Sequence, residues 1–95
     1  MPIFVGLLTT DLGIPEADTL KDKRQVLSGL LARLQRRFKV AVAEVAQQDA
    51  HRHAALAVVT VSNNPAQVHR VLMAVSRFIR AEPRVVVQTE TVEIM

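Results

Sequence analysis

The chain of 95 residues contains no cysteine, no tryptophan and no tyrosine, and it has only three phenylalanines. Without cysteine it forms no disulfide framework and offers no thiol nucleophile or thiolate metal ligand. No apolar run approaches the roughly 18–20 residues that a membrane-spanning helix needs. The amino-terminal segment lacks the basic start of a secretory signal peptide, and Thr9, Thr10 and Asp11 interrupt its apolar run. We therefore expect a cytoplasmic protein that does not enter a membrane.

Length and composition fit one globular domain over residues 1–95. Apolar residues make up 49% of the chain and charged residues 22%, which is too apolar for a disordered protein. No repeat, low-complexity tract or linker divides the sequence, so we expect no second domain.

Positive charge is concentrated in one segment of the chain. The formal net charge is +3, but residues 19–39 hold seven lysines and arginines and a single aspartate. This segment therefore carries +6 and the remainder carries −3. A basic segment in an otherwise acidic chain favours an anionic partner.

Hydrophobic periodicity predicts six elements in the order β-α-β-β-α-β, which is the ferredoxin-like split βαβ arrangement of the α+β class. Right-handed crossovers place both helices on one face of a four-stranded, mostly antiparallel sheet. Gly6, in the middle of the first strand, indicates that another element approaches the backbone closely. The strands are expected at residues 3–12, 40–46, 54–62 and 84–94.

Both helices begin at recognisable capping residues. Thr19 is the expected N-cap of the first helix, with Asp22 at the capping-box position. The second helix is expected to begin with Asn64 as N-cap, Pro65 at its first position and Gln67 at the box position. The expected apolar stripes are Leu20, Leu27, Leu30, Leu31, Leu34 and Phe38 in the first helix, and Val68, Val71, Leu72, Val75, Phe78 and Ile79 in the second.

The sheet face opposite the helices is expected to be apolar. Residues 3–8 and 54–61 are apolar at positions that point to both faces of the sheet, whereas a solvated face would be polar. An exposed apolar patch of this kind usually marks an interface. We therefore predict a homodimer formed through this face. The alternative is a monomer in which alanine and threonine keep the face only mildly apolar.

Two cations in the first turn of the first helix have two interpretations. Lys23 and Arg24 lie near the edge of the apolar stripe, where they oppose the helix macrodipole. In one interpretation they pair with an acidic residue such as Glu44. In the other they receive a phosphate together with the amides of the helix amino terminus.

The helical layer is also expected to carry a basic outer surface. Its cations would suit a phosphate backbone, although a solvated face explains them equally well. Among the strands only Phe4 offers a ring, so we expect any RNA contact to use helix cations and shape and not base stacking. The predicted nucleic-acid or anion-binding residues are Lys21, Lys23, Arg24, Arg33, Arg36, Lys39, Arg70, Arg77 and Arg80.

Nothing in the sequence predicts an enzyme, a cofactor or a metal site. Asp49, His51 and His53 resemble a fragment of a metal site, but a third strong ligand is missing and His69 lies on another element. There is no glycine-rich phosphate loop and no nucleophile with a recognisable base.

Four segments together resemble the YlxP-like bacterial proteins, a family of unknown function. They are residues 20–24 (LKDKR), 38–45 (FKVAVAEV), 48–49 (QD) and 61–63 (VSN). The resemblance spans nearly the whole chain and implies a small ferredoxin-like domain, usually encoded among translation and ribosome-maturation factors. It implies RNA or a ribosomal particle as the partner of the basic surface. A dimeric regulatory or protein-interaction module that uses the sheet face is the alternative function.

Overall fold

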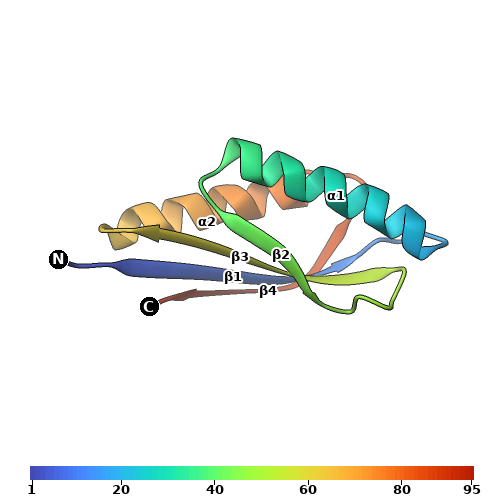
Figure 1. Cartoon of the computed structure of the whole chain (residues 1–95), viewed down its shortest axis with the longest axis horizontal. Coiled ribbons are helices and arrows are strands. Elements are labelled where there is room, and N and C mark those ends of the chain that lie inside the picture. Colours follow the sequence, from blue (N-terminus) through green and yellow to red (C-terminus); the bar gives the residue numbers. More distant parts are fainter.

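The computed structural model describes all 95 residues and confirms the ferredoxin-like βαββαβ fold. The sheet has the strand order β2-β3-β1-β4, and every neighbouring pair is antiparallel. Both helices lie on one side of this sheet (Figure 1). Neither helix is long and apolar enough to cross a membrane. The elements are β1 (Phe4–Gly13), α1 (Leu20–Arg37), β2 (Ala41–Ala46), β3 (His53–Ser62), α2 (Pro65–Arg80) and β4 (Val86–Ile94).

The helix boundaries follow from their capping residues, as the sequence predicts. The Thr19 hydroxyl accepts a hydrogen bond from the backbone N–H of Asp22 at 3.1 Å. The Asn64 side chain caps α2 in the same manner. The predicted box role of Gln67 is wrong, because its side-chain oxygen accepts hydrogen bonds from the Arg70 guanidinium instead.

The core fills the space between the sheet and the helices. A close approach at Gly6 is confirmed, since a Cβ atom there would lie 2.3 Å from a methyl carbon of Val68 and 2.8 Å from one of Leu72. Helix α2 therefore rests directly on the backbone of β1. The fifteen core residues are Leu8, Leu12, Ile14, Ala17, Leu27, Leu30, Leu34, Ala54, Leu56, Val58, Val68, Leu72, Val75, Ile79 and Val85.

The open face of the sheet, opposite the helices, is apolar in its centre and polar along β4. Val5 pairs with Val61 and Leu7 with Val59 on β1 and β3, and Val61 is 63% exposed. On the other side of β1, Leu7 pairs with Glu93 of β4. The expectation of an apolar open face is therefore met at Val5, Leu7, Val59 and Val61, but not at Asp11 of β1 or on β4 between Thr89 and Glu93, where polar residues lie on this face. The polar margin comprises Asp11, Thr89, Thr91 and Glu93.

Candidate nucleic-acid interface

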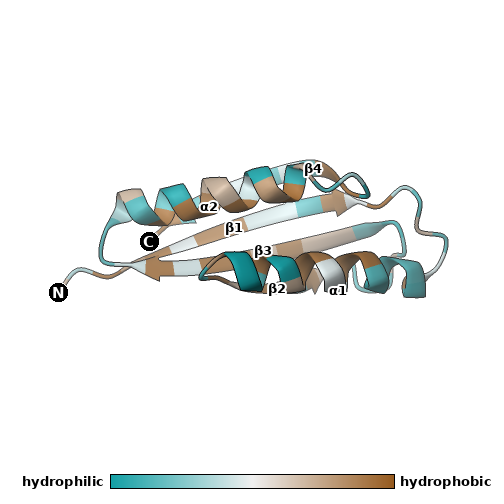
Figure 2. Cartoon of the chain, turned by 90° about the horizontal axis from the view of Figure 1, so that it is seen from above, coloured by the Kyte–Doolittle hydropathy of each residue, from teal (hydrophilic) through white to brown (hydrophobic).

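The two helices enclose a groove lined mainly by arginine and phenylalanine. They run in opposite directions and are offset along their length, with α1 on the β2 side and α2 on the β4 side of the sheet (Figure 2). Two adjoining hollows of ≈ 330 Å³ and ≈ 300 Å³ lie between them and share Arg37 and Phe78. We call this site the interhelix groove. Its lining residues are Arg33, Arg36, Arg37, Phe38, Ala74, Arg77 and Phe78.

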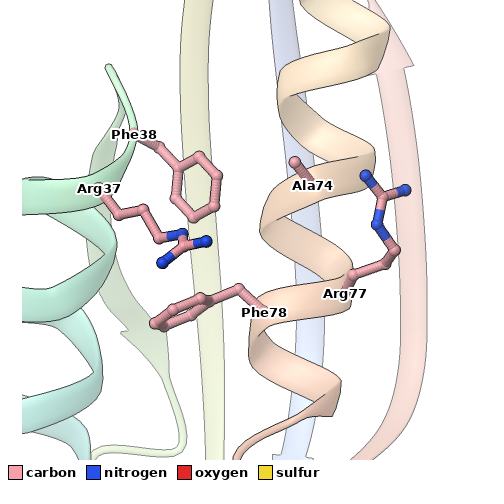
Figure 3. A pocket seen from close by; sticks show the side chains of 5 residues that line it. All are labelled: Arg37, Phe38, Ala74, Arg77 and Phe78. Carbon is pink, nitrogen blue, oxygen red and sulfur yellow. The ribbon is translucent and has the colours of Figure 1, made fainter.

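Arg37 lies beside the two rings of the interhelix groove, which contact each other. Its guanidinium carbon is 5.5 Å from the centre of the Phe78 ring and 6.0 Å from that of Phe38, distances at which a cation is attracted to the ring face. The two rings meet edge to face at 5.8 Å and 83°. Figure 3 shows the Arg37 side chain reaching from the end of α1 toward Phe78, while the Arg77 side chain points away from Arg37 and from both rings.

Three of the four arginines in the interhelix groove have no carboxylate partner. None of the salt bridges of the chain involves Arg36, Arg37 or Arg77. The fourth, Arg33, donates to Glu82 at 2.9 Å. The groove therefore carries excess positive charge, which raises the local attraction for anions.

Glu82 anchors one end of the groove. Its carboxylate is 11% exposed and accepts hydrogen bonds from Arg84 at 2.6 Å and from Arg33 at 2.9 Å. The hydrogen bond from Arg84, with the positive charges of Arg84 and Arg33, holds the pKa of Glu82 below its ordinary value. The same partnership raises the pKa of Arg84. The bond to Arg33 ties α1 to the turn between α2 and β4.

Lys23 does not face the solvent, and this corrects its predicted place in the anion-binding set. Its side chain is 1% exposed and its ammonium donates to the Glu44 carboxylate at 2.8 Å. It also donates to the backbone carbonyls of Gln47 at 2.8 Å, His53 at 3.0 Å and Gln48 at 3.4 Å. The three protons of an ammonium are thus already used. The ion-pair interpretation holds for Lys23, which fastens the β2–β3 hairpin to α1.

The remaining predicted cations do not form one continuous patch. Lys21 and Arg24 are exposed near the start of α1, respectively about 22 Å and about 18 Å along the helix axis from Arg36 at 1.5 Å per residue. Lys39, which the sequence analysis places among the cations of the helical layer, lies beyond α1, because that helix ends at Arg37. Lys39 is exposed in the link to β2.

The predicted cations of α2 differ in their partners. Arg70 is exposed and donates to Gln67 of the same helix. Arg80 lies 3.7 Å from the carboxylate of Glu90 on β4. Arg77, which has no such partner, is the only one of the three that lines the interhelix groove.

Two features of the groove were missed by the sequence analysis. Arg37 was outside the predicted set, and the rings of Phe38 and Phe78 were assigned wholly to the core. Both rings pack against the core but are only half-buried. The available signal was the position of all three residues at the carboxyl-terminal ends of the two helices, where a neighbouring helix covers side chains less completely.

Fold and groove together define a class: a small ferredoxin-like α+β domain with a cationic cleft between its helices. The chain belongs to the family described as "Protein of unknown function (DUF503)", whose family model matches residues 5–91. It is 32% identical over 82 residues to the uncharacterized protein YlxP of Bacillus subtilis (strain 168), covering 86% of this chain and 89% of that protein. The resemblance to YlxP-like proteins is thereby confirmed.

Solved structures that resemble this chain share its fold at low identity. A de novo designed protein with a ferredoxin fold superposes with a TM-score of 0.55 and 13% identity, covering 98% of this chain and 86% of the design. A second designed protein, Foldit4, gives a TM-score of 0.52 and 14% identity, covering 97% and 93%. At these identities the likeness shows the fold alone.

Proposed function

We propose that this protein is a non-catalytic, cytoplasmic RNA-binding protein that docks on RNA or a ribosomal particle through its helical layer. The observation that carries the proposal is the interhelix groove, in which Arg36, Arg37 and Arg77 lack carboxylate partners. Unpaired arginines on one face of a basic domain match a phosphate backbone, whose charges recur at short and regular spacing.

Cations outside the groove extend the proposed contact surface. Lys21 and Arg24 are exposed on the same helix as Arg36, respectively about 22 Å and about 18 Å along its axis from that residue. A strand of RNA that occupies the groove would therefore meet further positive charge along α1. These contacts add affinity without reading sequence.

The test is the salt dependence of RNA binding. Anisotropy of a labelled ribosomal RNA fragment, measured between about 50 and 200 mM salt, should show affinity falling steeply as salt rises. The double variant Arg36→Gln/Arg77→Gln should bind more weakly. Its log–log salt slope should be shallower by about 1.4, the value for two lost contacts to a single strand.

A matched control removes the same charge elsewhere. Arg52 and Arg84 are exposed, lie outside the groove and pair with carboxylates. The variant Arg52→Gln/Arg84→Gln has the same net charge as Arg36→Gln/Arg77→Gln and should retain most of the affinity. Equal losses in the two variants, or no binding at low salt, would contradict the proposal.

A second candidate function is self-association through the open face of the sheet. Val61 is 63% exposed and Val59 38% exposed on that face, next to Val5 and Leu7. A twofold axis parallel to the strands would stack β3 of one copy on β1 of the other, so that valines meet valine and leucine. It would also set the polar margin at Glu93 against the small alanines of β2 and keep the carboxylates of the two copies apart.

Light scattering tests this second candidate directly. The wild-type chain should have the mass of a dimer at high concentration, and Val61→Glu should reduce it to that of a monomer because it buries an unpaired charge. Val86→Glu is the matched control, since Val86 is 53% exposed but lies at the start of β4. A wild-type monomer would refute self-association and leave the RNA proposal unaffected.

A further inference from the structure

The interhelix groove has a feature that phosphate binding alone does not need. Two of the three phenylalanines of the chain line it, and both are only half-buried. Ring faces attract nucleobases through stacking, which every base can provide, whereas phosphates need only cations.

The Arg37 guanidinium and the Phe78 ring over which it lies form what we call the stacking platform. The guanidinium lies 5.5 Å from the ring centre of Phe78 and 6.0 Å from that of Phe38, so the two rings hold its position. It forms no salt bridge that would draw it away. Bases of single-stranded RNA stack both on aromatic rings and on guanidinium planes.

We propose that the interhelix groove binds an unpaired nucleobase of single-stranded RNA, stacked on the platform of Arg37 and Phe78. This inference rests on the proposed RNA-binding function and narrows its ligand. The bases of a duplex are stacked on one another, and they reach no ring in a hollow of ≈ 300 Å³ between two helices. A splayed base enters such a hollow, while Arg36 at its margin meets a flanking phosphate.

The first experiment removes the ring and keeps the charge. Phe78→Leu should weaken binding of a 12-nucleotide single-stranded oligouridylate by about tenfold at fixed salt, the loss expected for one stacked base. Its salt slope should be unchanged because no cation is lost. Binding of a blunt RNA duplex of equal length should not change. Phe4→Leu is the matched control, since Phe4 is also half-buried but lies on β1 outside the groove.

A second measurement does not depend on a loss of affinity. The chain contains no tryptophan, so Phe78→Trp introduces a single fluorophore at the platform. Oligouridylate should quench its emission by stacking, and the duplex should not. The inference is overturned if Phe78→Leu binds oligouridylate as the wild type does, or if Phe78→Trp shows no quenching at saturating RNA. Salt-dependent binding that persists in either case would leave the proposed RNA-binding function intact, whereas wild-type protein that binds neither RNA would refute both.

Discussion

Replacing Lys23 with methionine should cost this domain a large part of its stability. The substitution keeps most of the length of the side chain, which is 1% exposed, and removes its ammonium. Glu44 then loses its only ion-pair partner, and the carbonyls of Gln47 and His53 lose a donor. Breaking a buried pair from one side typically costs 3–5 kcal/mol. Because Glu44 is still 22% exposed, we expect a loss of about 3 kcal/mol, at the lower end of that range.

The size of this loss can be measured by thermal or denaturant unfolding. A domain of this length loses about 4–8 °C of melting temperature per kcal/mol, so Lys23→Met should melt roughly 12–24 °C below the wild type. Lys21→Met is the control, because it makes the same chemical change at an exposed position two residues earlier. It should change the free energy of unfolding by less than about 0.5 kcal/mol.

A double-mutant cycle separates the ion pair from the bonds to the hairpin. In the variant Lys23→Met/Glu44→Leu no unpaired charge remains, so part of the loss should be recovered. The remainder reports the hydrogen bonds to the backbone of the β2–β3 turn. If Lys23→Met costs under about 1 kcal/mol, or no more than Lys21→Met, the ammonium does not hold the hairpin.

Three further predictions concern the helices and their connections. Gly6→Ala should destabilise the fold by about 1–3 kcal/mol because the new methyl group collides with α2. Gly29→Ala lies in a helix and faces only a flexible side chain, so it should stabilise the fold by about 0.5–1 kcal/mol. If denaturant unfolding shows that both variants change the free energy of unfolding in the same direction, the packing argument is contradicted. Asn64→Ala should cost about 1 kcal/mol through loss of the N-cap of α2, measured by the same unfolding experiment. The pKa of Glu82 is lowered in the folded state by the hydrogen bond from Arg84. The contribution of Glu82 to folding stability is therefore complete at pH values above its ordinary pKa of 4.5, and it is lost as the pH falls through the lower pKa of the folded state. Glu82→Gln should therefore flatten the acid side of the curve of stability against pH, and a parallel downward shift of the whole curve would refute that assignment.

The elements could be predicted because each is fixed by local chemistry. Thr19 and Asn64 mark helix starts through hydrogen bonds to backbone amides one turn away. Gly6 signals the contact between β1 and α2 because a missing Cβ leaves room for a neighbour. Such signals act over a few residues or through one contact, so they can be recognised in the sequence alone.

The site was harder to predict because it depends on how distant elements meet. A helical wheel places Lys23 near the apolar stripe but does not show that the carbonyls of the β2–β3 turn bend over it. The groove depends on the offset of α1 against α2, which brings Arg37 beside Phe78 across forty residues of sequence. That offset is set by tertiary packing, and no periodicity of either helix encodes it.

Because the helices cover one side of the sheet only, the groove and the open face lie back to back in a molecule whose smallest dimension is 16 Å. Two copies joined through the open face would direct their clefts outward in opposite directions. One short oligonucleotide could not fill both clefts, but a long or folded transcript could bend around the pair. Bivalent attachment would then raise the overall avidity through effective concentration, without any new contact at either cleft.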